Sequence, residues 1–243
     1  MAFLSGRAAD AVEEMDKPDC DPARLRRTYA QFALVNRAVS GWRRAYLHQL
    51  RPRLAAAARS GPAMRRATLL DIGCGAGDVA RSLARWAAAD GLPVDITAID
   101  PDERAYAYAA SRPAVPGLSV RRAYSADLAA EGARFDIVVS NHILHHLSPA
   151  ELDGLLADSK LLCRSLALHS DIARSALAYV LFAAGTLPFF HRSYIRRDGL
   201  TSIRRSYTVP ELRRAVPPDW VVRQDSVFRL HLVFEPGRGA VGA

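Results

Sequence analysis

The segment from residue 71 to residue 77 carries the strongest chemical signal in the sequence. Asp71 is followed by glycines at positions 73, 75 and 77, directly after the apolar run Ala67–Ile72. Glycine lets a backbone turn sharply and lets a ligand approach with no Cβ in the way. In an open α/β sheet such a loop stands at the carboxyl ends of the strands, where ligands bind. The segment predicts a ligand loop, and Asp71 favours a positively charged ligand group over a pyrophosphate.

The spacing of the glycines separates this loop from the dinucleotide fingerprint Gly-x-Gly-x-x-Gly. In that fingerprint the third glycine would fall at position 78, which is Asp78 in this chain. We therefore consider a nicotinamide oxidoreductase and disfavour it.

Acidic residues follow the next two apolar runs. Asp100 comes after Val94–Ile99, a little over twenty residues beyond the glycines, where an acid can accept both hydroxyls of a ribose. Asp100 can also cap a helix that starts at Pro101, and the two roles are compatible. Asp127 follows Leu118–Ala123 and can accept a hydrogen bond from an adenine amino group, or it is an ordinary loop aspartate.

Three histidines, His142, His145 and His146, follow the apolar run Phe135–Ser140. If a helix begins at Asn141, their spacing of i, i+3 and i+4 places them on one face. Histidine titrates near neutral pH and suits a general base, although one or two of the three can equally be packing residues. No carboxylate or cysteine joins them at ligand spacing, so we predict no metal site.

Apolar runs alternate with amphipathic stretches through this part of the chain, which implies parallel strands with helical crossovers. Two short apolar stretches near the end, Trp220–Phe228 and Arg229–Glu235, predict an antiparallel pair. Before the alternation, Asp21–Ala58 has a helical pattern that Gly41 divides into two helices. The predicted strands are Ala67–Ile72, Val94–Ile99, Leu118–Ala123, Phe135–Ser140 and Arg164–His169, and the predicted helices between them are Asp78–Ala89, Asp102–Ala110 and Pro149–Leu161.

The Asp-x-Gly-x-Gly-x-Gly loop and the motif Phe135–Leu147 resemble those of class I S-adenosylmethionine-dependent methyltransferases. The resemblance covers residues 67–171, with a compatible ending at 209–235. It implies an α/β, Rossmann-like, mostly parallel seven-stranded sheet with helices on both faces and an antiparallel last strand. We expect an N-terminal helical lid over residues 1–60 and a methyltransferase domain over residues 61–243. Within that domain, residues 172–208 would be an insertion that caps the substrate.

The resemblance also implies which residues hold S-adenosylmethionine. The glycine loop would wrap the methionine part, the acid at 100 would hold the ribose, and the acid at 127 would take the adenine amino group. An arginine of the N-terminal helices, 43 or 44, can pair with the cofactor carboxylate or stay solvated. The implied cofactor residues are Arg43, Asp71, Gly73, Cys74, Gly75, Gly77, Asp100, Pro101, Ala126, Asp127, Leu128, Ser140 and Asn141.

Other segments resemble a narrower group of bacterial enzymes that methylate polyketide phenols and quinones: Asn36-Arg37, residues 41–44 and residues 198–208. We therefore expect O- or C-methylation of a hydrophobic aromatic small molecule such as a phenol or quinol. The catalytic candidates are His142 and His145. The candidates for contact with the acceptor, which can also simply pack the cap onto the core, are His146, Phe182, His191, Tyr194, Arg205 and Tyr207.

Composition limits the other possibilities. The net charge is +8, and a nucleic-acid methyltransferase is the alternative that this charge suggests. The arginines are scattered, however, and Ser140-Asn141-His142 stands where many base-methylating enzymes have Asn-Pro-Pro-Tyr. No stretch reaches roughly 18 uninterrupted apolar residues, so we expect no membrane span. Three widely spaced cysteines suit a reduced cytoplasm. A non-enzymatic binding protein with this fold stays a further alternative, as do a monomer and a homodimer.

Overall fold

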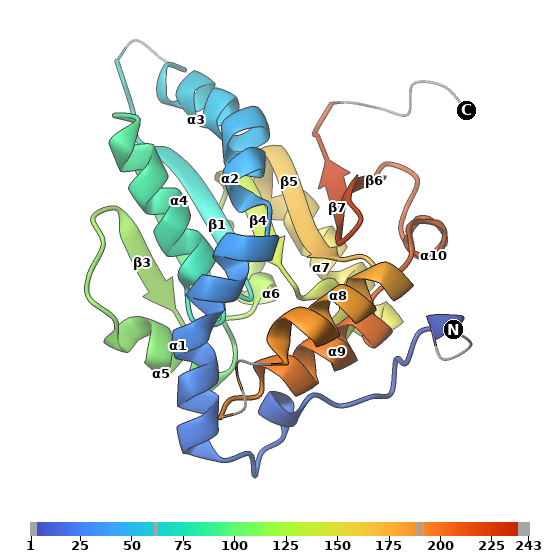
Figure 1. Cartoon of the computed structure of the whole chain (residues 1–243). Helices are drawn as coiled ribbons and strands as arrows, with labels where there is room; N and C mark the ends of the chain where they lie inside the picture. Colours follow the sequence, from blue (N-terminus) through green and yellow to red (C-terminus); the bar gives the residue numbers. More distant parts are fainter. Residues whose placement is uncertain (1–3, 61–62, 188–189, 191, 238–243) are drawn as a thin grey trace.

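The computed structural model describes residues 4–60, 63–187, 190 and 192–237, with the backbone alone described for 37–39. Its centre is a seven-stranded sheet in the order β3-β2-β1-β4-β5-β7-β6 (Figure 1). The first five strands pair in parallel, whereas β7 is antiparallel to both of its neighbours. The predicted fold class is therefore confirmed. The strands are β1 (Ala67–Ile72), β2 (Val94–Ile99), β3 (Leu118–Arg121), β4 (Phe135–Asn141), β5 (Cys163–Ile172), β6 (Val221–Ser226) and β7 (Arg229–Phe234).

The central strands are apolar on both faces because helices cover both faces. Successive side chains point to opposite sides of a strand, so Leu69 and Leu70 of β1 belong to two different cores. One core joins the sheet to α2 (Trp42–Ala45), the π-helical turn η3 (Tyr46–Leu50), α3 (Arg51–Ala58) and α4 (Asp78–Ala89). The other joins it to α6 (Ser125–Ala130), α7 (Pro149–Leu162) and α10 (Val209–Ala215).

The N-terminal region has the two helical parts that the sequence predicts. Helix α1 (Pro22–Val39) starts at Asp21, whose carboxylate accepts hydrogen bonds from the backbone N–H groups of Ala23 and Arg24. Gly41, with φ of 66°, then turns the chain into α2. A third buried cluster joins Leu25 and Tyr29 of α1 to Ala105 of α5 (Glu103–Ser111).

The insertion forms two helices, α8 (Ala176–Thr186) and α9 (Ile195–Arg205), which pack against each other (Figure 1). Helix α9 also contacts α1, the 3-10 turn η2 (Glu14–Asp16) and the 3-10 turn η4 (Leu144–His146). Segments from both ends of the sequence therefore meet beside the end of β4. Among the described residues, no helix has the length and apolar character that crossing a membrane requires.

Three local predictions are wrong. Strand β4 continues through Asn141, and the chain then turns at His142, with φ of 61°, into the short η4 instead of an α-helix. The three histidines therefore do not share one helix face. Residues 125–130 form α6, which is absent from the predicted helices, and β5 extends beyond the predicted end at His169 to Ile172 because β7 pairs with its end.

Candidate active site

A cavity of about 1000 Å³ lies at the carboxyl ends of β1, β2 and β4. The glycine loop and Asp100 form part of its wall, and side chains of α1, α8 and α9 form another part. The size is at the upper end for small-molecule sites, which hold about 300–1,000 Å³, so a cofactor and a second molecule can share it.

Asp71 is a buried carboxyl group without a charged partner. Its side chain is 1 % exposed and lines the cavity, neither oxygen makes a hydrogen bond of normal geometry among the described residues, and the Ala80 backbone offsets its burial only in part. Burial, and then the charge of Asp100, raises the pKa of Asp71 to about 8. An unpaired buried carboxylate is costly. A cationic ligand group beside it would supply the missing partner, so Asp71 fits the positively charged methionine part of S-adenosylmethionine.

Asp100 organises the loop from the end of β2. One of its oxygens accepts a hydrogen bond from the Gly75 N–H at 2.8 Å, and the other accepts from the Asp102 N–H at 3.0 Å. The N-cap of α5 is Asp102, so Asp100 is not the capping residue of that helix. Burial raises the pKa of Asp100. Its carboxylate lines the cavity, as expected of a group that accepts ribose hydroxyls.

The three loop glycines all have positive φ but have different surroundings. A Cβ on Gly73 would lie 2.6 Å from a methyl carbon of Ile143, and one on Gly77 would approach Ala109 at 3.6 Å. A Cβ on Gly75 would meet no atom within 4 Å. Since Gly75 lines the cavity and Gly77 does not, the open cradle for a ligand lies at Gly75.

Gly75→Ala should therefore preserve the fold and weaken cofactor binding. A matched control is Gly91→Ala, because Gly91 also has positive φ and open space but lies outside the cavity. Each alanine costs about 1–2 kcal/mol of backbone strain. We expect similar losses of melting temperature in the two variants. Titration calorimetry with S-adenosylmethionine should show a loss of about tenfold or more, roughly 1.4 kcal/mol, for Gly75→Ala alone. Equal affinities of the two variants would argue against the cradle.

Four more of the implied cofactor residues line the cavity, namely Cys74, Pro101, Ala126 and Asn141. Asp127, Leu128 and Ser140 do not. Asp127 accepts the Tyr124 N–H at 2.8 Å and so caps α6, and Leu128 is in the core. The hydroxyl of Ser140 is fully buried, 2.7 Å from Nδ1 of His169.

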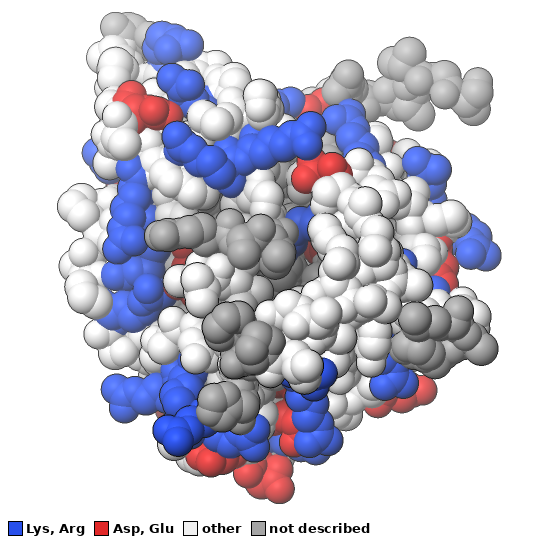
Figure 2. All heavy atoms as spheres, viewed as in Figure 1, with Lys and Arg blue, Asp and Glu red and all other residues white. Residues whose placement is uncertain are grey.

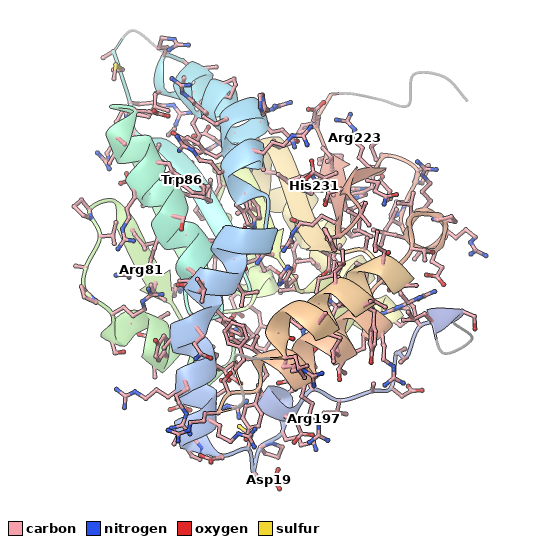
Figure 3. The ribbon with its side chains drawn as sticks, in the orientation of Figure 1. Asp19, Arg81, Trp86, Arg197, Arg223 and His231 are labelled. Carbon is pink, nitrogen blue, oxygen red and sulfur yellow. The ribbon has the colours of Figure 1, made fainter. Side chains whose placement is uncertain are left out.

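Arg43 also lies outside the cavity. Its guanidinium stands over the ring of Trp86, 5.1 Å from the ring centre, on α4 (Trp86 is labelled in Figure 3). Arg44 is 4.0 Å from Asp225. Both arginines thus contact residues outside the cavity, Trp86 and Asp225, and not the glycine loop.

His142 lies in the cavity wall beside the buried Arg229. Its Nε2 accepts a hydrogen bond from the Arg229 guanidinium, which also donates to Oδ1 of Asn141 at 3.3 Å. Trp42 of α2 donates to the same oxygen at 2.9 Å. Burial and the charge of Arg229 hold the pKa of His142 well below its usual range, so the imidazole is neutral. The backbone of His142 also has a positive φ of 61°. Such a conformation costs a residue other than glycine about 1–3 kcal/mol, and it is concentrated at functional sites.

His145 is held between two carboxylates. Its Nδ1–H donates to Asp171 at 2.7 Å, and its Nε2 lies 3.5 Å from Oε1 of Glu13. Burial alone would lower the pKa of His145, but the two carboxylates raise it to about 9. Burial works against ionisation of Asp171 too, yet His145 lowers the pKa of this carboxyl to about 2. His145 is therefore not a free base in this arrangement.

His146 has similar surroundings. Its Nε2 lies 3.7 Å from the same Glu13 oxygen, and its Nδ1 lies 3.3 Å from Asp16. The sequence predicted no metal site because no carboxylate was near the histidines. The fold removes that reason, since Glu13 arrives from the N-terminal segment.

The remaining predicted acceptor residues divide into two groups. Phe182 lines the cavity. Tyr194, Arg205 and Tyr207 do not, and each joins the cap to the N-terminal segment. The Tyr194 hydroxyl accepts the Asp21 N–H at 2.9 Å, Arg205 lies 3.9 Å from Glu13, and Tyr207 lies 3.6 Å below the guanidinium of Arg7. His191 lies outside the described residues.

Sequence reasoning missed Glu13, Asp171 and Arg229. Asp171 is the last residue but one of β5, and a polar residue near the end of that strand is a usable signal because strand ends face ligands in this fold class. Glu13 lies in a polar, irregular N-terminal stretch, and Arg229 begins a strand at the far end of the chain. Glu13 and Arg229 become candidate site residues only because the fold brings them next to His145 and His142.

Comparisons with known proteins agree with this geometry. Residues 69–165 match a family described as "Methyltransferase domain". A ubiquinone biosynthesis O-methyltransferase of Roseobacter denitrificans is 32% identical over 120 residues, which are 48% of this chain and 46% of that protein. One of Caulobacter vibrioides is 39% identical over 84 residues, 33% of this chain and 31% of that protein. The matches thus span less than half the length of these relatives.

The fold also has solved counterparts. A crystal structure of the plantazolicin methyltransferase BamL, in complex with a triazolic desmethylPZN analog and SAH, superposes with a TM-score of 0.55 at 11% identity. That comparison covers 87% of this chain and 95% of the other. Residues 69–165 thus match a methyltransferase domain, and the sheet order and the glycine loop that ends β1 have the Rossmann-like methyltransferase fold of these solved structures.

Proposed function

We propose that the protein transfers a methyl group from S-adenosylmethionine to an oxygen or carbon atom of a hydrophobic aromatic small molecule. One observation carries the proposal. The same cavity contains the unpaired Asp71, the acceptor group Asp100 and a wall of aromatic and aliphatic side chains. The unpaired acid and Asp100 suit the cofactor, and the apolar part of the wall suits an aromatic acceptor.

The apolar wall comes from elements outside the central sheet. Phe32 and Val35 project from α1, Phe182 from α8 and Ile195 from α9, and Phe228 precedes β7. The ring of Phe182 packs directly against Gly199, where a Cβ would clash with it. This packing fixes the ring at the cavity, and α8 and α9 together supply much of its apolar wall.

S-adenosylmethionine supplies a sulfonium methyl group that is already activated for transfer. The protein must then align the acceptor and exclude water, and orientation can supply about 7–11 kcal/mol of the barrier. We assign the base to His142, because both ring nitrogens of His145 face carboxylates. To take the acceptor proton, His142 exchanges its hydrogen bond from Arg229 for one from the acceptor hydroxyl.

His142→Asn should lower kcat by about 10²–10⁴, the usual contribution of a general base. The Kd for S-adenosylmethionine should change little, because the loop and the two aspartates are untouched. His48→Asn is the control, since His48 is exposed on η3 and does not line the cavity. Steady-state kinetics and calorimetry separate the two effects. A kcat within about twofold of wild type would rule out the assigned base.

The acceptor class is tested with methyl-labelled cofactor and mass spectrometry. Phenols, quinols and aromatic polyketides should gain one methyl group, and nucleic acids should not. The described relatives are named for ubiquinone biosynthesis, which supports phenolic candidates first. On the face in Figure 2, Lys and Arg form separate groups divided by uncharged and acidic atoms, unlike a continuous nucleic-acid track. Labelling of RNA or DNA with no aromatic product would overturn the proposal.

A further inference from the structure

Two histidines and a carboxylate converge on one point in the cavity wall. The Nε2 atoms of His145 and His146 lie 3.5 Å and 3.7 Å from Oε1 of Glu13, and all three atoms are within 4.8 Å of one another. Nitrogen and oxygen ligands about 2.0–2.2 Å from a tetrahedral zinc ion lie roughly 3.4 Å apart. Two of the three pairs are therefore near ligand spacing already.

The surroundings of these histidines are those of metal ligands. A metal-binding histidine almost always gives its other ring N–H to a carboxylate, a carbonyl or water. His145 has Asp171 at Nδ1, at 2.7 Å, and His146 has Asp16 at Nδ1, at 3.3 Å. Both rings thus present Nε2 to the common oxygen of Glu13. A single ion pair with Glu13 would need only one of these histidines, yet both have a carboxylate at Nδ1 and face Glu13 with Nε2.

One atom of the group lacks a hydrogen bond. His145 is 1 % exposed, and its Nε2 makes no hydrogen bond of normal geometry among the described residues; it faces Oε1 of Glu13 at 3.5 Å, which is long for such a bond. Glu13 is also buried, and its Oε1 accepts a hydrogen bond from Ser202 at 2.8 Å, which fixes the carboxylate. A buried polar atom without a partner calls for an explanation such as an ion.

The charges favour a cation as well. With neutral imidazoles, the group has three carboxylates, Glu13, Asp16 and Asp171, while one guanidinium, that of Arg205, lies 3.9 Å from Glu13 and 3.8 Å from Asp16. A divalent ion balances the remaining two negative charges. In its absence, a proton on His145 offsets part of the excess.

We propose that Glu13, His145 and His146 form a binding site for a divalent transition-metal ion of the Zn²⁺ type. Three protein ligands leave a fourth position free, as in catalytic zinc sites. Since all three residues line the cavity, that position faces the proposed acceptor space. The ion would join the N-terminal segment to the turn after β4 and can hold an acceptor oxygen. This last use rests on the proposed function, whereas the metal binding does not.

The test uses Co²⁺ as a spectroscopic probe on full-length protein that has been treated with a chelator, without S-adenosylmethionine. We expect one Co²⁺ per chain, the intense visible absorption of a tetrahedral ion, and a higher melting temperature with metal. Glu13→Gln and His146→Ala should each weaken binding by at least about 100-fold. Asp16→Asn should weaken it by about 10-fold, the lower end of the usual cost of an outer partner.

His48→Ala is the control and should bind as wild type, because His48 lies outside the cavity. If Glu13→Gln fails to fold, His146→Ala decides, since that side chain is 30% exposed and less embedded. Absence of stoichiometric Co²⁺ binding to wild type, or unchanged binding in a folded His146→Ala, overturns the site. Either result leaves cofactor binding and methyl transfer to be judged by their own assays.

Discussion

Asp100→Ala should lower the affinity for S-adenosylmethionine by at least about 100-fold. The carboxylate holds the loop through the N–H groups of Gly75 and Asp102, and it is the acceptor for the ribose hydroxyls in our proposal. Hydrogen bonds to a charged group contribute about 1.5–3 kcal/mol each, so losing the two bonds to the ribose hydroxyls gives this magnitude. Titration calorimetry measures the effect, and the product S-adenosylhomocysteine should lose as much, because it has the same ribose.

Asp95→Ala is the matched control for this variant. Asp95 lies on the same strand, but its carboxylate is half exposed and pairs with Arg66 at 2.7 Å outside the cavity. Exposed ion pairs contribute little, so its affinity should be that of wild type. Asp100→Asn should be intermediate, since an amide keeps one acceptor oxygen. If Asp100→Ala binds both ligands as tightly as the control, the ribose assignment is wrong.

Asp71→Asn should stabilise the protein without ligand and weaken its binding of the cofactor. The amide has nearly the shape of the carboxyl group but cannot ionise, and Asp71 is buried with no partner for a negative charge. A cationic ligand group would interact with the ionised carboxylate by about 1.5–3 kcal/mol. We therefore expect a loss of roughly 10- to 100-fold in affinity at pH 8, measured by calorimetry.

The pH dependence gives the sign of the stability effect. The pKa of Asp71 is about 8 in the folded protein, above the ordinary value of 3.8, so between these values the folded state holds a proton that the unfolded state has released. The wild type therefore loses stability as pH rises through this window. The Asn variant lacks this contribution. Its advantage in unfolding free energy should grow from pH 4 to pH 8 and reach on the order of a few kcal/mol.

Cofactor binding should show the opposite trend. Binding of a cation favours the ionised carboxylate, so the affinity of wild type should rise towards pH 8, by up to about tenfold per pH unit. The affinity of Asp71→Asn should lack this rise. Parallel pH profiles for the two proteins, in stability and in binding alike, would mean that Asp71 does not titrate in this window.

Local sequence patterns were sufficient for the sheet and for its ligand loop. The boundaries of β1 and β2 follow from the apolar runs Ala67–Ile72 and Val94–Ile99, and Asp71 and Asp100 lie at the carboxyl ends of these runs. These residues and the glycines lie within one strand–loop–helix–strand unit, so their meeting follows from parallel pairing. Where a residue's place depends on a short turn, sequence reasoning was weaker. Asp127 was expected to take the adenine amino group or to be an ordinary loop aspartate, yet its carboxylate accepts the Tyr124 N–H in the capping box of α6.

The sequence by itself therefore determined the fold class, the glycine loop and the acids at the strand ends, because neighbouring segments specify all of them. Only the tertiary structure decided the states of the histidines. Glu13 and Asp171 reach His145, and Arg229 reaches His142, from distant parts of the chain. The pKa values of these histidines depend on burial and on the charges of their partners. The burial and the partners, and with them the proposed metal-ligand set, arise only when remote segments pack together.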